Sequence, residues 1–514
     1  MMGILRTILF AATGLAATGA AFAQQTDSAS LFRTQREHAS PVAALAATAY
    51  ATPALRSEAF AGSLSEISVG YEMRREEKAL EQQKGDGGDF GRFSAGSYKH
   101  ISGKGTVWGD AGYLRGAKRN VVWNASSDYD LVFPYVVADS IGGDLTSEEY
   151  TFGGGYGHRS GRYTWALEAG ARALHEYRDS DPRIRNVAID IDAGAGASVR
   201  MGNYRLGLSA ALRVYKQSGS QIQYAHSAGE KGVYHLSGLG SHYAGFEGNA
   251  NSQTRYRGSG YGLTFALVPD AGRGGLHLAA GYEYLHIEKE LPGSADLVLQ
   301  KVVPRSFHAE AAWLRGSGNG LRWGVALKAR YDYRRGDEGI VDDNNSSQGS
   351  GTLGFLTLFE YSALQGRAEA VFGVEAAGHA WYVCPWGEYR RRTSDYLYPA
   401  QNMEFTRAGG GVDFRCVLQR RSLLLRLEAG GGYTAGLDSG LTLPVADLAA
   451  PLVRMVQYDY GRLRQDAATF RLGLRADYAL RRRMSLFLAA DYGGGLYGDN
   501  TAAHHARVAC GIAF

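Results

Sequence analysis

Residues 204–217 read YRLGLSAALRVYKQ, and their side chains alternate between two kinds along the stretch. One face is apolar and the other polar, charged or small: Tyr204, Leu206, Leu208, Ala210, Leu212 and Val214 against Arg205, Gly207, Ser209, Arg213 and Gln217. An alternation with a period of two residues predicts a β-strand with one apolar face. Strands of soluble sheets typically run to about five or six residues, and this stretch is much longer. It therefore predicts a strand that crosses a membrane, with Leu208 toward lipid and Ser209 toward the interior of a barrel.

The same alternation recurs from about residue 62 to the end of the chain, and short and long connections follow one another in strict order. Tight turns are predicted near residues 103–105, 160–162, 201–203, 269–274, 316–320, 364–366, 419–422 and 481–483. Longer connections are predicted near residues 77–88, 121–147, 178–185, 218–254, 290–297, 337–350, 389–401, 437–465 and 498–502. Eight short and nine long connections join eighteen strands. An even strand number with this alternation predicts an all-β fold, a transmembrane antiparallel up-and-down β-barrel of about 18 strands.

The composition agrees with a barrel and excludes a nucleic-acid-binding protein. Glycine contributes 70 of the 514 residues, about twice its average share, and tyrosine contributes 32. Many short glycine-rich strands with tyrosines at their ends are typical of barrels with aromatic girdles. The formal net charge of +4 is small for this length, and no basic face or Lys/Arg run stands out.

The N-terminus predicts export. Arg6 precedes a short stretch of apolar and small residues, and residues 21–23 (AFA) form a small-x-small cleavage site, so residues 1–23 are expected to be a signal peptide. Residues 24–61 do not alternate and are expected to be an N-terminal periplasmic arm or a short plug, followed by the barrel in residues 62–514. No other stretch has the length of a transmembrane helix, and closed strands are the remaining way to span a membrane. The expected location is the bacterial cell outer membrane.

Several short motifs resemble those of a known family. They are residues 52–54 (TPA), 133–135 (FPY), 138–144 (ADSIGGD), 149–150 (EY), 154–156 (GGY) and 181–183 (DPR). With these motifs the chain resembles a Bacteroidota family of outer-membrane β-barrel proteins of unknown function, over nearly the whole mature chain. The resemblance implies the fold and the compartment, and it suggests surface lipoproteins or TonB-dependent receptors as partners. It implies no catalytic residues.

One long connection carries the candidate pore-mouth residues. Between residues 120 and 158 there are six acids and no Lys or Arg, with aromatic residues between them. We predict that this loop folds inward and narrows the mouth, with its carboxylates toward the water of a cation-preferring opening. The alternatives are a Ca²⁺ site made of hard oxygen ligands, and a solvated external loop. The candidate residues are Asp128, Asp130, Phe133, Tyr135, Asp139 and Asp144.

The inward faces of the predicted strands carry charges of both signs. The candidate lumen charges are Glu168, Arg172, Arg213, Arg426, Glu428, Arg471, Arg475 and Asp477. They either line a water-filled pore or pair across a filled lumen and stabilise the wall.

These patterns leave two main functions open. Eighteen strands enclose a lumen of porin size, so a channel or transporter for small solutes is expected. The alternative is a docking or assembly component without an open pore, acting with lipoproteins or a TonB-dependent transporter. The chain is too short to be such a transporter itself, with a large plug and 22 strands. The barrel-insertion machinery is expected to recognise the last strand through Phe514, and outer-membrane lipids are expected to surround the wall.

No catalytic activity, cofactor or metal is expected. The sequence contains no nucleophile elbow, zinc-protease motif or phosphate-binding loop. The spacing of His226, His235 and His242 matches no compact metal site. Three widely spaced cysteines do not form a disulfide framework.

Overall fold

A computed structural model describes residues 29–219, 233–243, 253–270, 274–292, 297–316, 319–341, 352–444, 450–481 and 483–514. Eighteen antiparallel strands form one sheet, and pairing of the first with the last closes it into a barrel. The strands are β1 (Leu64–Glu76), β2 (Gly87–His100), β3 (Gly105–Val121), β5 (Gly143–Ser160), β6 (Tyr163–Tyr177), β7 (Arg185–Met201), β8 (Tyr204–Gly219), β11 (Thr254–Pro269), β12 (Gly275–Leu291), β13 (Leu297–Arg315), β14 (Gly320–Val341), β15 (Thr352–Glu375), β16 (His379–Tyr396), β17 (Gln401–Arg420), β18 (Leu423–Thr442), β19 (Ala467–Arg481), β20 (Met484–Tyr497) and β21 (Ala502–Ala513). The predicted eighteen-strand barrel is confirmed.

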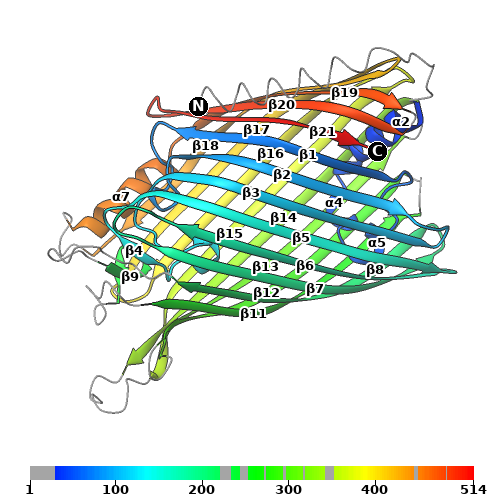
Figure 1. The fold of residues 1–514 in the computed structure, drawn as a ribbon. Coiled ribbons are helices and arrows are strands. Elements are labelled where there is room, and N and C mark those ends of the chain that lie inside the picture. Colours follow the sequence, from blue (N-terminus) through cyan, green and yellow to red (C-terminus); the bar gives the residue numbers. More distant parts are fainter. Residues whose placement is uncertain are drawn as a thin grey trace.

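Shorter elements lie at the two ends of the barrel (Figure 1). At the short-turn end are α2 (Ala29–His38), α3 (Pro41–Ala44), α4 (Ala47–Tyr50) and α5 (Pro53–Arg56). At the end of the long connections are η1 (Gln82–Lys84), α6 (Tyr129–Val132), β4 (Val137–Asp139), β9 (Val233–Gly238), β10 (Ser241–His242) and α7 (Pro451–Leu463). None of the helices in the described ranges is both long and apolar enough to cross a membrane.

The short turns lie at one end of the barrel as predicted, but not every connection at the other end is long: those after β12, β16 and β20 have five, four and four residues, like the turns after β11 and β2. Two predicted positions are the furthest from the observed ones. Residues 364–366, predicted as a turn, lie inside β15, and the turn between β15 and β16 follows at residues 376–378. Residues 389–396, predicted as a long connection, belong to β16, so only residues 397–400 separate β16 from β17. Both errors arise because these strands are longer than a bilayer requires, and Gly366 is accommodated within a strand.

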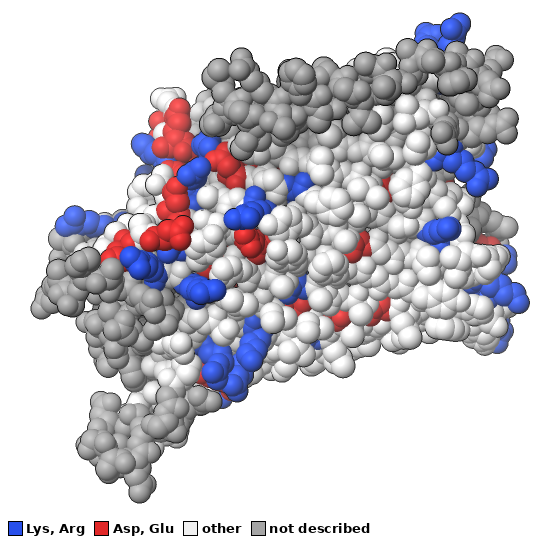
Figure 2. Space-filling view, in the orientation of Figure 1, with Lys and Arg blue, Asp and Glu red and all other residues white. Residues whose placement is uncertain are grey.

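The two faces of the wall are as predicted. Leu208 is 62% exposed on the outer face, while Ser209 is buried on the inner face. Ser209 lies beside the plug helices rather than in open water, because residues 52–54 approach the wall there. On the face shown in Figure 2, acidic and basic residues gather toward the end of the long connections, and most of the middle of the wall carries neither.

Both ends of the barrel chain lie at the short-turn end. β1 begins at Leu64 and β21 ends at Ala513, and the two strands pair with Ile67 opposite Ile512. The described N-terminal residues precede β1 and enter the lumen from this end (Figure 1).

Candidate functional site: the chamber inside the barrel

Residues 29–62, here called the plug, occupy the short-turn end of the lumen. Leu55 of α5 lies over Gly207 of β8, where an added Cβ would be 2.9 Å from the leucine side chain. Leu45 lies over Gly324 of β14 in the same way, at 2.8 Å. A glycine inside a strand allows another segment to approach the sheet closely. These two glycines therefore form sockets in the wall for leucines of the plug.

Polar contacts also fasten the plug. Glu58 lies 3.6 Å from Arg205 and 3.8 Å from Arg159, two arginines of the wall. Gln35 of α2 donates hydrogen bonds to Asp477 at 3.2 Å and to Ser485 at 3.0 Å. The apolar contacts of the plug are divided among four separate small clusters, each shared with a different part of the wall.

The opposite end of the lumen is narrowed by long connections that share one apolar cluster, here called the mouth core. Residues 122–142 cross the mouth, and β4 pairs with β9 of the connection between β8 and β11. Helix α7 of the connection between β18 and β19 packs against them. Buried members of the mouth core from these connections are Trp123, Val132, Tyr135, Val136, Ala138, Leu236, Leu239, Leu452, Met455 and Val456.

The aromatic part of the candidate pore-mouth loop lies inside the barrel. Phe133 meets Phe359 of β15 edge to face, with ring centroids 5.5 Å apart. Tyr135 is 1% exposed, and its carbonyl accepts a hydrogen bond of 2.8 Å from the Tyr256 hydroxyl. Arg334 of β14 donates to the carbonyl oxygens of Phe133 and Asp130. The loop is therefore fixed to the inner wall.

Two acids of this loop face the lumen but are paired. Asp128 lies 2.7 Å from Arg172 of β6 and accepts a hydrogen bond of 3.0 Å from the Tyr215 hydroxyl. Asp130 is the most exposed of the group and lies 2.8 Å from Lys84. Basic residues distant in sequence thus neutralise much of the charge that the loop sequence carries by itself.

The other two acids do not face the opening, which corrects the expected orientation. Asp139 is fully buried beside Arg178, at 3.4 Å, and caps backbone N–H groups of its own turn. Asp144 lies at the start of β5 and pairs with Arg119 at 2.6 Å. Arg119 also binds Asp89, which accepts a hydrogen bond from Tyr71 on the outer face. A charge on the outer wall cannot line the lumen.

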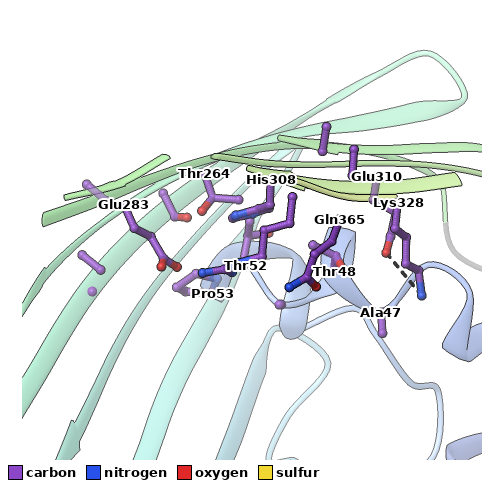
Figure 3. A pocket seen from close by; sticks show the side chains of 18 of the residues that line it. Ala47, Thr48, Thr52, Pro53, Thr264, Glu283, His308, Glu310, Lys328 and Gln365 are labelled. Atoms are coloured by element: carbon purple, nitrogen blue, oxygen red, sulfur yellow. Dashed lines mark ion pairs between the residues drawn. The ribbon is translucent and has the colours of Figure 1, made fainter. Parts of the chain in front are cut away.

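Between the plug and the mouth core the barrel encloses a chamber. It consists of two adjoining cavities of about 680 and 630 Å³, whose linings share Ala211, Glu283 and Arg330. In Figure 3 residues of the plug lie opposite polar side chains of the wall. The labelled residues are Ala47, Thr48, Thr52 and Pro53 from the plug and Thr264, Glu283, His308, Glu310, Lys328 and Gln365 from the wall. The volumes fall in the range of small-molecule sites.

All eight candidate lumen charges are ion-paired. The pairs are Glu168 with Arg56 (3.8 Å), Arg172 with Asp128 and Glu149 (2.7 and 3.3 Å), Arg213 with Asp190, Arg426 with Asp477 (3.3 Å), Glu428 with Arg415 (3.7 Å), Arg471 with Asp413 (2.7 Å), and Arg475 with Glu66 and Asp477 (2.5 and 2.8 Å). Buried charges are expected to pair in this way. The candidate lumen charges are therefore members of ion pairs on the inner wall and do not form a ring of unpaired charges.

Glu283 differs from the candidate lumen charges. It is exposed on the inner face of β12 and lines both cavities of the chamber. Among the residues that the structure places, no ion pair to Glu283 occurs. It was not among the residues predicted from the sequence, although its position on the inward face of an alternating strand was a usable signal.

Further cavities extend from the chamber toward the short-turn end. A cavity of about 350 Å³ shares Glu168 with the chamber, and one of about 360 Å³ shares Arg56, Trp108 and Asp110 with the 350 Å³ cavity. The last of them reaches Leu64 at the start of β1. The Arg56 guanidinium lies at the junction, 5.6 Å from the centre of the Trp108 ring. A row of adjoining cavities thus passes beside the plug.

Helix α7 is a second feature that the sequence analysis missed, since it predicted only a long connection there. Pro451 in the first turn and apolar residues at 452, 455 and 456 were the available signals. Burial raises the pKa of Asp459 on this helix to about 7, although the Gln82 N–H donates a hydrogen bond of 3.2 Å to the carboxyl group. Tyr458 and Arg462 hold α7 to the carbonyl of Ala79.

Two of the three loop histidines lie in the described residues. His235 is buried in β9, His242 lies in β10, and His226 lies outside the described residues. No group of three or more His, Cys, Asp or Glu that could hold a metal ion occurs in the described part of the chain. Cys384, Cys416 and Cys510 are free thiols. Of the long connection predicted near residues 337–350, residues 337–341 belong to β14, and the residues after 341 lie outside the described ranges.

The fold and the chamber define the class: a closed eighteen-strand barrel with an apolar outer wall and a polar, occupied lumen. Residues 53–514 match a family of unknown function, DUF6850, and the chain belongs to this family. No curated protein matches the chain.

Three solved structures illustrate what the barrel is similar to. The ferric yersiniabactin uptake receptor FyuA from Yersinia pestis is 9% identical, with a TM-score of 0.36 over 88% of this chain and 80% of that chain. The ferric preacinetobactin receptor BauA from Acinetobacter baumannii is 9% identical, with a TM-score of 0.38 over 88% and 79%. CdiB from Acinetobacter baumannii is 8% identical, with a TM-score of 0.35 over 88% and 60%. Likeness at this level gives no argument about a solute or a partner.

Proposed function

We propose that the protein is an outer-membrane transporter of small polar solutes, which passes them through a chamber that the plug closes on the periplasmic side. The row of adjoining cavities carries the proposal. It connects the chamber, whose two cavities measure about 680 and 630 Å³, with the start of β1. It runs beside the plug rather than through the wall. A solute of a few hundred cubic ångströms fits there, and displacement of the plug would open its exit.

The lining supports a polar solute. The chamber surface carries hydroxyl, amide and imidazole groups from Thr48, Thr264, Gln365 and His308, beside the exposed carboxylate of Glu283 (Figure 3). Hydrogen-bonding groups without a fixed excess of one charge suit solutes that carry several hydrogen-bonding groups. The proposal is one of transport without catalysis or a cofactor.

The proposed location is the outer membrane of a Bacteroidota bacterium, after export by the signal peptide in residues 1–23. The band of exposed apolar side chains around the wall, which includes Leu208 and Leu212, supports insertion into lipid. Insertion would proceed through the last strand, whose Val508 and Ile512 are exposed on the outer face and which Phe514 follows.

A docking function without transport is the second candidate, and the mouth core favours it. Three long connections narrow the mouth with buried apolar side chains, as expected of a rigid platform. A surface lipoprotein or a TonB-dependent receptor would be the partner. Under this proposal the chamber would be a by-product of barrel size.

Planar-bilayer conductance distinguishes the two functions. We expect the intact protein to conduct little, and a variant that lacks residues 29–62 to open channels of uniform size. Heat-modifiable migration shows whether the deletion variant still forms a barrel. Absence of conductance from a correctly folded deletion variant would reject transport and support docking.

A further inference from the structure

One region of the outer wall carries basic residues at the edge of the lipid-facing band. Lys216 of β8 lies directly opposite Arg257 of β11 in the strand register, and both side chains are exposed. Arg185, near the start of β7, is exposed on the same outer face. We call these three residues the basic patch.

Apolar side chains continue from the basic patch toward the middle of the wall. Ile189 lies opposite Lys216 on β7 and is 42% exposed. Val214 and Leu212, the next outward positions of β8, are 56% and 67% exposed. Aromatic rings accompany them, since Tyr261 and Tyr284 stack with centroids 5.3 Å apart. Tyr261 lies opposite Leu212 in the strand register. Apolar and aromatic positions that give way to basic positions along one strand direction mark the boundary between hydrocarbon and lipid headgroups.

The pairing of charges in the basic patch is incomplete. Arg257 forms an ion pair with Glu290 at 3.4 Å, but Glu290 also forms an ion pair with Arg255 at 3.6 Å. In the described ranges neither Lys216 nor Arg185 has a carboxylate partner, and Arg185 has only a long contact of 3.4 Å with His175. Like charges directly opposite each other on neighbouring strands destabilise a sheet. An anion between Lys216 and Arg257 would remove this repulsion.

We infer that the basic patch binds the phosphate groups of an anionic lipid, whose acyl chains lie along Ile189, Val214 and Leu212. The charge of the patch complements phosphate, and the apolar residues beside it complement acyl chains. The patch lies at the end of the long connections, which is the outer leaflet in the proposed topology. The inference is independent of transport, because it concerns the outer wall and not the lumen.

Titration of the detergent-purified full protein with diphosphoryl lipid A, read by native mass spectrometry, tests the inference. The test variant is Lys216→Gln with Arg257→Gln. The matched control is Lys99→Gln with Arg315→Gln, two exposed basic residues near the short-turn end. Each basic residue near a lipid surface contributes about 1 kcal/mol, so the loss of two is expected to weaken binding about thirtyfold. The control variant should bind like the wild type.

Two comparison ligands identify the source of the phosphate. Phosphatidylcholine, which carries no net charge, should bind weakly and equally to all variants. Inorganic phosphate should not displace lipid A when it is added at the concentration at which lipid A saturates the protein. Equal lipid A binding by wild type and test variant would overturn the inference. Displacement of lipid A by inorganic phosphate, or binding of phosphatidylcholine to the wild type as tightly as lipid A, would also overturn it. Heat-modifiable migration verifies that each variant is folded.

Discussion

The plug at one end of the lumen and the connections at the other end are held in different ways. The mouth core is one continuous apolar cluster, made by three connections that are far apart in sequence and pack against six or more strands. The plug has no such core of its own and touches the wall through four small clusters and a few polar contacts. Local opening requires least free energy where few apolar side chains are buried together. We therefore expect the plug to be the part that moves, while the connections at the mouth keep their packing.

The plug and the mouth core both depend on a wall inserted in lipid, and disruption of that wall should have the largest effect. We expect Leu208→Arg to prevent insertion, because arginine at mid-bilayer depth costs about 2–4 kcal/mol. Ala211→Arg on the same strand places the same side chain in the chamber and should be tolerated. Heat-modifiable migration after membrane extraction measures both. Equal loss of both variants would show that the faces of β8 are assigned wrongly.

The next largest effect should come from the mouth core. Tyr135→Ala removes a fully buried ring, and such truncations cost about 3–5 kcal/mol. We expect proteolysis within residues 122–142 to become much faster, with the barrel intact. Tyr150→Ala, which removes a ring from the exposed outer face, is the control and should leave cleavage unchanged. Unchanged cleavage of the Tyr135 variant would show that the mouth is not held by this cluster.

A smaller effect is expected at the plug. Gly207→Leu fills the socket under Leu55, so the plug should be displaced while the outer face of β8 is untouched. Single-channel recordings should show more frequent openings than in the wild type. The control is Gly366→Leu, because Gly366 has a strand conformation and open space around the position of an added Cβ. Gly202→Leu would be strained for another reason, since Gly202 has a positive φ of 61°. Equal opening frequencies in the wild type and the Gly207 variant would contradict a movable plug.

The smallest effect should be a pH dependence of α7. The carboxyl group of Asp459 has a pKa of about 7 when α7 is docked, against an ordinary value of 3.8. The docked state therefore holds the proton more tightly, so docking is strongest below about pH 4 and weakens as the pH rises through 7. A spin label at the exposed position 457, in a background without the native cysteines, should be more mobile at pH 8 than at pH 5.5. Asp459→Asn should abolish the difference, and a pH dependence that persists in this variant would exclude Asp459 as its source.

The sequence predicted the wall better than the lumen, and the reason is physical. Alternation along a strand such as residues 204–217 depends on each residue's own preference for lipid or water, so it can be read locally. The plug and the mouth core depend on contacts between distant segments. The acids of residues 121–147 predicted a cation-preferring mouth, but Arg172, Arg178 and Arg119 neutralise them from other strands. Arg172 and Arg119 lie in strands and Arg178 in the connection after β6, so the sequence of the loop alone cannot show that they lie beside its acids.

The position of the plug was beyond sequence reasoning for a similar reason. Residues 24–61 showed no alternation, and their sequence carries no sign of a partner. Their binding sites are glycines of the wall, such as Gly207 and Gly324, and these read only as interruptions of strands. Such a socket can be recognised only when the positions of the plug leucine and of the wall glycine are both known.

Hydrogen exchange of the full protein in lipid nanodiscs tests the central claim most directly, because it reports opening at both ends in one sample. We predict that the backbone amides of α2–α5 exchange through local opening at least ten times faster than those of α6 and β4, after correction for intrinsic rates. Barrel strands should remain protected throughout. Exchange of α6 and β4 that is as fast as that of the plug, or faster, would contradict the account and place the moving part at the mouth.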